Sequence, residues 1–208
     1  MRERFGLYVV LSDPRAGYER CTEAAIAQGV RYLQLRMKAR PQAEVLEVAR
    51  RLRAMTRGTG TRFIVNDDVE VAIACDADGV HLGQGDMSLA EARRRWITPG
   101  KIFGLSTHDE AQEEDARALS PAYIGIGPFF PTPTKQPPDA ALGPERAARI
   151  ALASPLTTVA IGGINTGNLR WVLTLGIVNF AVVRAVCATS DPRKAIAELQ
   201  AIWLERAM

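Results

Sequence analysis

The chain alternates short apolar runs with longer segments of helical periodicity, and this alternation continues over its whole length. The short runs are rich in β-branched and aromatic residues, which favour β-strands. Strands that alternate with helices pair in parallel, because each helix returns the chain to the same edge of the sheet. The candidate strands are Leu7–Leu11, Tyr32–Arg36, Phe63–Asn66, Gly79–Leu82, Ile102–Ser106, Ala122–Gly127, Thr157–Ile161 and Val178–Val183.

Eight strands, each followed by a helix, predict an α/β fold of the (β/α)8 type, a single TIM barrel over residues 1–208 with its active site at the C-terminal ends of the strands. A length of 208 residues is near the lower end for this barrel, so its loops must be short. The alternative, a doubly wound open sheet, leaves the polar residues at nearly every strand end unexplained. The candidate helices are Tyr18–Gln28, Gln42–Arg57, Val69–Cys75, Ser88–Trp96, Asp109–Leu119, Pro144–Leu152, Thr166–Leu175 and Pro192–Glu205.

Composition narrows the classes of partner. A net charge of +3 is too small to indicate nucleic acid, and no run of about 18 apolar residues predicts a membrane span. The three cysteines form no CxxC pair, which favours a reduced, cytoplasmic protein. We therefore expect small-molecule substrates. Trp96 and Trp203, on outer helices, are either contacts of a homo-oligomer or ordinary packing, and packing is the more common role.

The second candidate strand ends in charged residues at alternating positions. Gln34, Arg36 and Lys38 are two apart, so an extended chain directs all three side chains toward the barrel mouth, where the two cations can bind phosphate oxygens. Leu35 and Met37 then face the helices. Taken alone, this segment is better explained as a strand end with solvated charges.

Acidic residues follow the next two strands. Asn66 and Asp67 end the third strand, and Asp86 follows the fourth, so two carboxylates meet at neighbouring points of the rim. Mg²⁺ favours one or two carboxylates together with phosphate oxygens and water, so we expect a magnesium site. Helix capping is the alternative, and we prefer it for Asp68 but not for Asp67 or Asp86.

Two later segments have features of phosphate sites. Thr132, Thr134 and Lys135 lie in a proline-rich loop after the sixth strand, and such a loop is more often only a spacer. Gly162–Gly163 after the seventh strand and Val183–Arg184 after the eighth occupy the usual phosphate position of a barrel.

The histidines and Ser106 show no catalytic pattern. His81 and His108 have no companions that suggest a triad, so a structural role is expected for each. Ser106, at the end of the fifth strand, is expected to be a hydrogen-bond donor in the site.

Taken together, these segments resemble the thiamine-phosphate synthase family. The resemblance runs through LYVVLSDP, YLQLRMK, FIVNDDVEVAIACDADGVHLGQGD, IFGLSTH, YIGIGPFFPTPTK, VAIGGI and FAVVRAV. It implies a (β/α)8 barrel that joins hydroxymethylpyrimidine diphosphate to a thiazole phosphate, with Mg²⁺ as cofactor. It also implies a dissociative reaction, in which diphosphate leaves before the thiazole nitrogen attacks.

The same resemblance implies roles for individual residues. Met37 replaces a usual acidic residue, and Arg184 replaces a usual serine. The pyrimidine diphosphate would contact Gln34, Leu35, Arg36, Met37, Lys38, Asn66, Ser106 and Lys135; the thiazole phosphate would contact Thr132, Pro133, Thr134, Gly163, Val183 and Arg184; and Mg²⁺ would bind Asp67 and Asp86.

Three alternative functions differ in the residues that they require. A thiazole tautomerase shares the barrel but does not need Asn66, Asp67 or Asp86. A non-catalytic protein that binds thiazole or thiamine phosphates has no evident use for metal ligands and converging cations. An aldolase or isomerase acting on another phosphorylated metabolite needs a Schiff-base lysine or an acid–base pair, whereas Lys38 and Lys135 have neighbours typical of phosphate binding.

Overall fold

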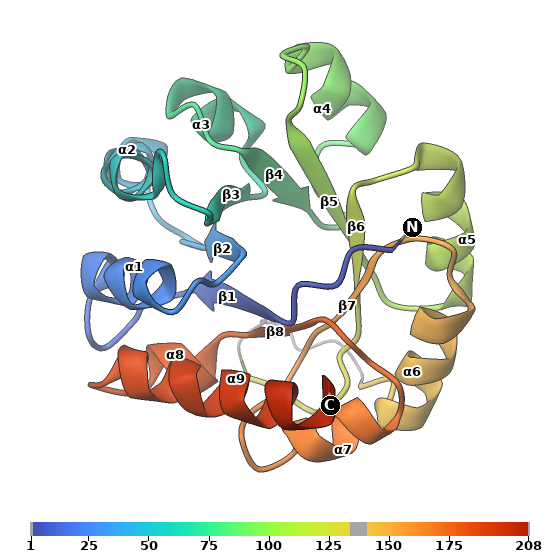
Figure 1. Cartoon of the computed structure of the whole chain (residues 1–208). Coiled ribbons are helices and arrows are strands. Elements are labelled where there is room, and N and C mark those ends of the chain that lie inside the picture. The colour runs from blue at the N-terminus through green and yellow to red at the C-terminus, as the bar shows by residue number, and fades with distance from the viewer. Residues whose placement is uncertain (1, 134–140, 208) are drawn as a thin grey trace.

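Eight parallel strands pair in chain order and close into a barrel, as predicted (Figure 1). The computed structural model describes residues 2–133 and 141–207, with side chains described as far as residue 205. Pairing of the first strand with the last closes the barrel, with Leu7 beside Phe180 and Val9 beside Val182. The strands are β1 Leu7–Leu11, β2 Tyr32–Leu35, β3 Arg62–Asn66, β4 Gly79–Leu82, β5 Ile102–Thr107, β6 Tyr123–Ile126, β7 Thr158–Ala160 and β8 Phe180–Val182.

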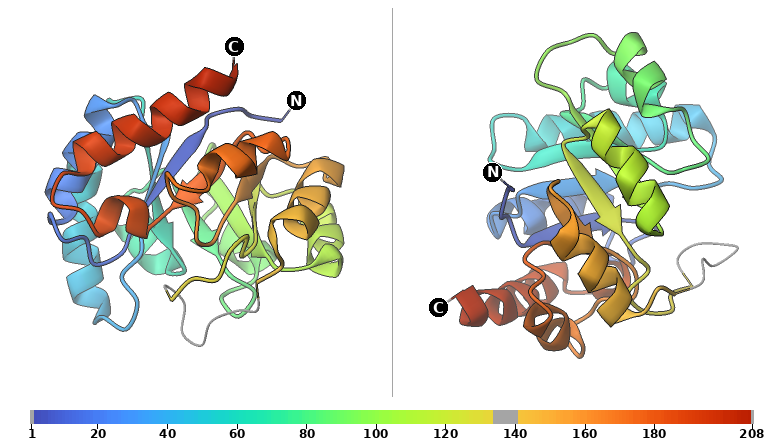
Figure 2. Two further views of the ribbon diagram at one scale, coloured as in Figure 1. Left: turned by 90° about the horizontal axis from the view of Figure 1, so that it is seen from below. Right: turned by 90° about the vertical axis from the view of Figure 1, so that its right-hand side faces the viewer.

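The helices surround the strands in every view (Figures 1 and 2). Sequence periodicity predicted all of them except a four-residue helix after β8, because four residues make only one turn and show no period. The helices of the described ranges are α1 Tyr18–Ala27, α2 Gln42–Thr56, α3 Val69–Ala74, α4 Leu89–Arg95, α5 Glu110–Leu119, α6 Pro144–Ala153, α7 Leu169–Thr174, α8 Arg184–Cys187 and α9 Pro192–Ala207.

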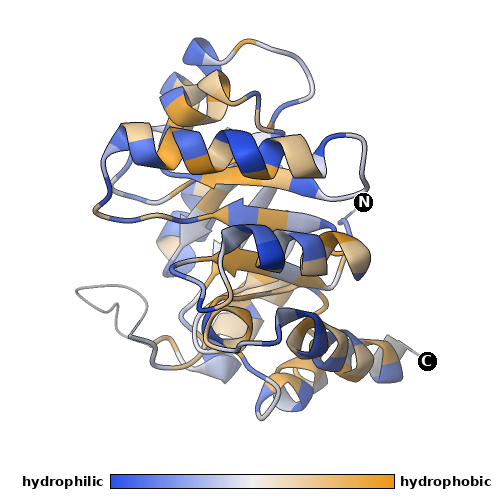
Figure 3. Ribbon diagram, turned by 90° about the vertical axis from the view of Figure 1, so that its left-hand side faces the viewer, coloured by the Kyte–Doolittle hydropathy of each residue, from blue (hydrophilic) through white to orange (hydrophobic). Residues whose placement is uncertain are grey.

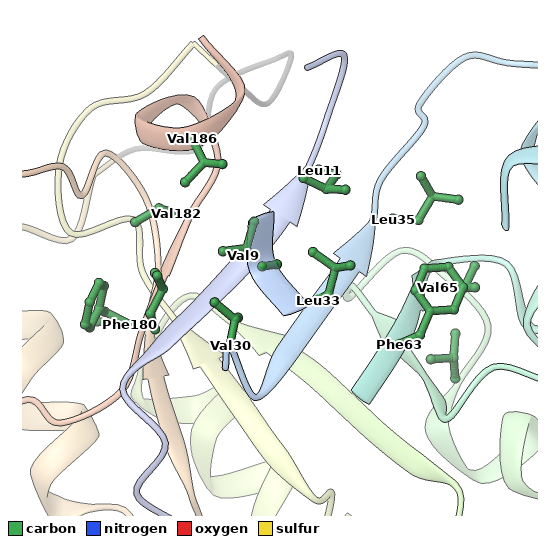
Figure 4. Close-up of a cluster of buried hydrophobic side chains, with 14 of the residues drawn as sticks. Val9, Leu11, Val30, Leu33, Leu35, Phe63, Val65, Phe180, Val182 and Val186 are labelled. Carbon is green, nitrogen blue, oxygen red and sulfur yellow. The ribbon is translucent and has the colours of Figure 1, made fainter. Parts of the chain in front are cut away.

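The main hydrophobic core lies between the strands and the helices. Val9, Leu11, Leu33 and Leu35 belong to it, and each is at most 1% exposed (Figure 4). Full burial of such a side chain contributes about 1.5–3 kcal/mol. Figure 3 shows the same division, with mostly hydrophobic strands enclosed by helices of mixed hydropathy. This layer fixes which strand residues face outward, and therefore which face the barrel interior.

A second, smaller cluster fills the interior of the barrel. Tyr8, Tyr32, Ile64, Tyr123 and Val159 are buried there, from five different strands. Three tyrosines bring polar hydroxyl groups into this buried interior. Those hydroxyls need hydrogen-bond partners, and all of them have one.

Asn179 holds the N-terminal segment against the lower end of the barrel, the end opposite the mouth. Its Oδ1 accepts from the backbone N–H groups of Phe5 and Gly6, at 2.8 and 3.1 Å. Its Nδ2 donates to the carbonyl oxygens of Glu3 and Thr158, at 2.8 and 3.2 Å. The side chain is buried, so four hydrogen bonds compensate its removal from water.

The two tryptophans expected on outer helices pack within their own chain. Trp96 is 5% exposed, and the indole Nε1 of Trp203 donates to the carbonyl of Val178 at 2.9 Å. Both tryptophans therefore make packing contacts within the chain. The cysteines are buried free thiols. Within the described ranges, every helix is too short or too polar to cross a bilayer.

Candidate active site

The end of β2 and the residues that follow it turn alternate side chains to opposite sides, as their spacing predicted. Gln34 is 4% exposed, and its Nε2 donates to the hydroxyl of Tyr8 in the barrel interior at 2.9 Å. Leu35 and Met37 pack against the outer core. A ligand in the mouth would therefore meet the backbone of these two residues rather than their side chains.

The two cations of this segment lie in different surroundings. Arg36 is half-buried, and its Nη1 donates to Ser12 Oγ at 3.4 Å. Burial lowers the pKa of the Arg36 guanidinium, although the nearby carboxylates of Asp67 and Asp13 oppose the shift. The exposed ammonium of Lys38 forms an ion pair with Asp67. Both cations thus lie near Asp67, the residue that follows β3.

Asp67 and Asp86 meet at the mouth, as expected from neighbouring strand ends. Asp67 has a positive φ of 64°, and its N–H donates to the carbonyl of His81 at 2.8 Å, which holds the strained residue against β4. The Oδ2 of Asp86 accepts from the N–H of Gly83 at 2.7 Å. A Cβ on Gly83 would lie 3.1 Å from that oxygen, so the glycine permits the tight turn.

The carboxyl groups of Asp67 and Asp86 lie close enough to shift each other's pKa. Burial raises the pKa of Asp67 to about 6; the bond to Asp86 adds to this shift, and Lys38 opposes it. Burial also disfavours the charged form of Asp86, but the bonds from Asp67 and from the Gly83 N–H outweigh it and lower its pKa. Two neighbouring carboxyl groups disfavour two negative charges, and a cation bound between them would relieve that repulsion.

Capping explains Asp68 but not Asp86. Asp68 Oδ1 accepts from the N–H of Val71 at 2.9 Å at the start of α3. The cap of α4 is Ser88, which accepts from the N–H of Glu91 at 3.2 Å. The alternative considered for Asp86 therefore does not apply.

The donors at this point match the chemistry of Mg²⁺. Two carboxylates are hard oxygen ligands, and Mg²⁺ in phosphate-transfer sites takes its remaining ligands from water and substrate. Across residues 2–133 and 141–207, no group of three or more His, Cys, Asp and Glu side chains could hold a metal. The Asp67–Asp86 pair thus fits a metal that arrives with a phosphorylated substrate rather than one held in a protein cage.

Asn66 and Ser106 also lie near the mouth. Asn66 ends β3 beside His81 of β4, and its side chain is half-buried. Ser106 lies within β5, one residue before its end, and its Oγ is 2.8 Å from His81 Nε2.

The loop after β6 packs closely against Gly162 and Gly163. These glycines have φ values of 90° and 70°. A Cβ on Gly162 would lie 2.5 Å from Cβ of Pro128, and a Cβ on Gly163 would lie 2.6 Å from Cβ of Phe130. The double glycine is thus needed for close approach as well as for its backbone conformation. It is more than a simple turn.

The residues expected to hold a thiazole phosphate are placed as follows. Thr132 is half-buried and Pro133 exposed, in the loop after β6, while Thr134 and Lys135 lie outside the described residues. Val183 precedes α8, and the exposed Arg184 is its first residue. A short extra helix after β8, next to the loop after β7, is a frequent phosphate site in barrels.

Sequence reasoning underestimated the interior polar residues. His81 is structural, as expected, but it also links Ser106 to the tyrosines of the interior. Tyr8 and Tyr123 were assigned no role beyond strand formation. The available signal was polar side chains at alternate positions of neighbouring strands, such as Tyr8 on β1 and Gln34 on β2.

Comparison with known proteins agrees with this geometry. The family model described as thiamine monophosphate synthase matches residues 7–186. The thiamine-phosphate synthase of Archaeoglobus fulgidus is 41% identical over 182 residues, covering 88% of this chain and 85% of the relative. That of Laribacter hongkongensis is 40% identical and covers 95% of both chains.

A solved structure is similar over nearly the whole chain. The thiamine phosphate pyrophosphorylase from Pyrococcus furiosus superimposes with a TM-score of 0.85 at 36% identity, covering 98% of each chain. The likeness therefore includes the whole barrel.

Proposed function

The chain belongs to the thiamine monophosphate synthase family, and from that premise we propose that it catalyses one particular transfer. The hydroxymethylpyrimidine group moves from its diphosphate to thiazole phosphate, giving thiamine phosphate and diphosphate. The observation that carries the proposal is the meeting of Asp67, Asp86 and Lys38 at the mouth, next to half-buried Arg36. Carboxylates for a metal and cations for phosphate oxygens are the groups that a diphosphate substrate requires.

In this proposal, the chain's own residues stabilise charge and hold the substrates. The bond between the pyrimidine methylene carbon and the diphosphate oxygen breaks, and its electron pair leaves with diphosphate. The thiazole nitrogen then donates its lone pair to that carbon. Arg36, Lys38 and Lys135 neutralise the departing charge, and Mg²⁺ bound by Asp67 and Asp86 would supply further positive charge to the diphosphate.

Positioning accounts for the rest of the proposed catalysis. Gln34, Asn66 and Ser106 orient the pyrimidine, and the loops after β6, β7 and β8 hold the thiazole phosphate. Two substrates held in contact react as one molecule, and no protein nucleophile is needed. The buried reduced cysteines support a cytoplasmic setting.

The test is formation of thiamine phosphate from the two substrates, first with Mg²⁺ and then with a chelator. We expect product with the metal and none without it. Product that is indifferent to chelation would contradict the metal assignment. Thiazole phosphate that is isomerised or only bound, without product, would support the tautomerase or the binding protein.

A further inference from the structure

A chain of four hydrogen bonds crosses the barrel interior and joins two residues of the proposed pyrimidine site. Gln34 Nε2 lies 2.9 Å from the Tyr8 hydroxyl, which is 2.8 Å from the Tyr123 hydroxyl. The Tyr123 hydroxyl is 3.2 Å from His81 Nδ1, and His81 Nε2 is 2.8 Å from Ser106 Oγ. We call this chain, from Gln34 through Tyr8, Tyr123 and His81 to Ser106, the interior relay.

A glycine on β5 makes space for the relay. Gly104 of β5 stands between β4 and β6, and a Cβ there would lie 2.7 Å from His81 Nδ1 and 2.5 Å from the Tyr123 hydroxyl. The absence of a side chain on β5 therefore lets His81 and Tyr123 meet. Their rings are stacked, with an interplanar angle of 12°.

The three inner residues of the relay each supply one hydrogen-bond donor. Burial raises the pKa of Tyr8 and of Tyr123, so both hydroxyls stay protonated. The His81 ring stacks on Tyr123 and lies 3.2 and 2.8 Å from the hydroxyls of Tyr123 and Ser106, and as a neutral imidazole it holds one N–H. Tyr8, Tyr123 and His81 together supply three donors.

The relay has four hydrogen bonds and therefore needs four donors. Its inner residues supply three, so the fourth donor comes from Gln34 or Ser106, and whichever of these two does not donate accepts a hydrogen bond. In the structure, the Nε2 of Gln34 donates inward. Each bond then runs in the same direction, and His81 Nε2–H donates to Ser106 Oγ. The Ser106 hydroxyl proton is left for the mouth, and Gln34 has its Oε1 as the acceptor that does not face Tyr8.

We propose that Tyr8, Tyr123 and His81 are positioning residues that make Ser106 a donor and Gln34 an acceptor, so that the site selects a pyrimidine with an amino group beside a ring nitrogen. The amino group donates to Gln34 Oε1, and the ring nitrogen accepts from Ser106. An oxo-pyrimidine presents the opposite pattern, because its ring N–H donates and its oxygen accepts. Binding it would require every bond of the relay to reverse.

This inference rests on the proposed function, and hydroxyl deletions test it. We would prepare Tyr8→Phe and Tyr123→Phe, which break the relay and keep the rings. The matched control is Tyr32→Phe, because Tyr32 lies in the same interior cluster but donates to Glu3 Oε2 at 2.8 Å, outside the relay. For each variant, kcat/KM would be measured with the amino-pyrimidine diphosphate and with its oxo analogue, alongside Tm.

The expected result separates positioning from a merely structural role. Tyr8→Phe and Tyr123→Phe should lower kcat/KM for the amino substrate about tenfold, while the KM for thiazole phosphate stays unchanged. Their preference for amino over oxo substrate should fall by a similar factor. Tyr32→Phe should keep the wild-type preference, whatever its Tm. The double variant should lose no more than either single one, because one break already ends the coupling.

The outcomes distinguish the relay from the proposed function. Unchanged amino preference in both relay variants, with normal product formation, overturns the relay and leaves the function intact. A wild-type protein that makes no thiamine phosphate overturns the proposed function and this inference with it. Nitrogen NMR of His81 adds an independent check, because a neutral ring protonated on Nδ1 would reverse the direction of the relay.

Discussion

The two ends of the barrel are built on opposite principles. At the mouth, Asp67 has a left-handed backbone conformation, its pKa is raised by burial and by Asp86, and Lys38 provides the neighbouring positive charge. At the lower end, Asn179 makes four hydrogen bonds, and Phe5 packs against Tyr32 with ring centroids 4.6 Å apart. The mouth thus concentrates charge and backbone strain, whereas at the lower end both polar atoms of the Asn179 amide have hydrogen-bond partners.

This difference shows how a barrel divides stability from chemistry. In the proposed function, the charged side chains of the mouth bind an anion and a metal; before these ligands arrive, the charges oppose each other or are partly desolvated, so they contribute little to folding. Residues at the lower end bind no ligand in the proposed function, so packing and hydrogen bonding alone determine their arrangement. Substitutions at the mouth should therefore change activity, and substitutions at the lower end should change stability.

The largest effect is expected from the carboxylate pair. Asp67→Ala or Asp86→Ala should lower kcat about 10³-fold, about 4 kcal/mol of barrier, because the metal charge on the leaving diphosphate is lost. Thermal unfolding should change little. Metal-dependent formation of thiamine phosphate measures the first quantity, and calorimetry the second. Asp68→Ala is the matched control: it should cost about 1 kcal/mol of stability through the lost cap of α3 and leave activity near wild type.

The lower end should show the reverse pattern. Asn179→Ala removes four hydrogen bonds and leaves buried backbone groups unsatisfied, so the free energy of unfolding should fall by about 3 kcal/mol. The kcat well below Tm should stay unchanged. Urea titration and steady-state kinetics give the two values. Asn165→Ala removes an exposed amide near the mouth and should cost less than about 1 kcal/mol; a similar loss in both variants would contradict the division.

His81 lies between the two ends and links stability to pH. Burial lowers its pKa from 6.5 to about 4, so the folded protein favours the neutral ring. Below pH 6.5 the unfolded chain binds a proton that the folded protein resists, so stability falls as pH decreases from 6.5 toward 4. Because the side chain is only partly buried, we expect a loss of about 1–2 kcal/mol between pH 7.5 and 5.

His81→Gln should remove that part of the acid sensitivity. Denaturant unfolding at several pH values measures it as the difference between the wild-type and variant slopes. Parallel slopes over this range would show that His81 titrates normally.

The smallest effect separates backbone strain from steric contact. Gly163→Ala and Gly100→Ala both place a side chain at a positive φ, of 70° and 78°. Nothing lies within 4 Å of a Cβ on Gly100, whereas one on Gly163 meets Phe130. Gly100→Ala should cost about 1 kcal/mol and Gly163→Ala about 2 kcal/mol. Only Gly163→Ala should raise the KM for thiazole phosphate, and equal effects would place that phosphate elsewhere.

Most of the fold was predictable from the sequence because it depends on local patterns. Alternation in β2 predicted that Gln34 faces inward and Met37 outward, and strand order predicted that Asp67 and Asp86 meet. Capping was also assigned correctly, to Asp68 and not to Asp86, and the structure adds that Ser88 caps α4 while Asp86 accepts from the N–H of Gly83. The four-residue α8 was missed because one turn has no measurable period.

The sequence by itself determined the eight βα units, their order around the barrel and the strand ends that carry charge, because these follow from the periods of 2 and 3.6 residues. The tertiary structure alone decided the ion pair of Lys38 with Asp67, the raised pKa of Asp67 and the relay through Tyr8, Tyr123 and His81. These contacts join residues on different strands. Their distances depend on barrel closure and on gaps such as Gly104, which no local pattern encodes.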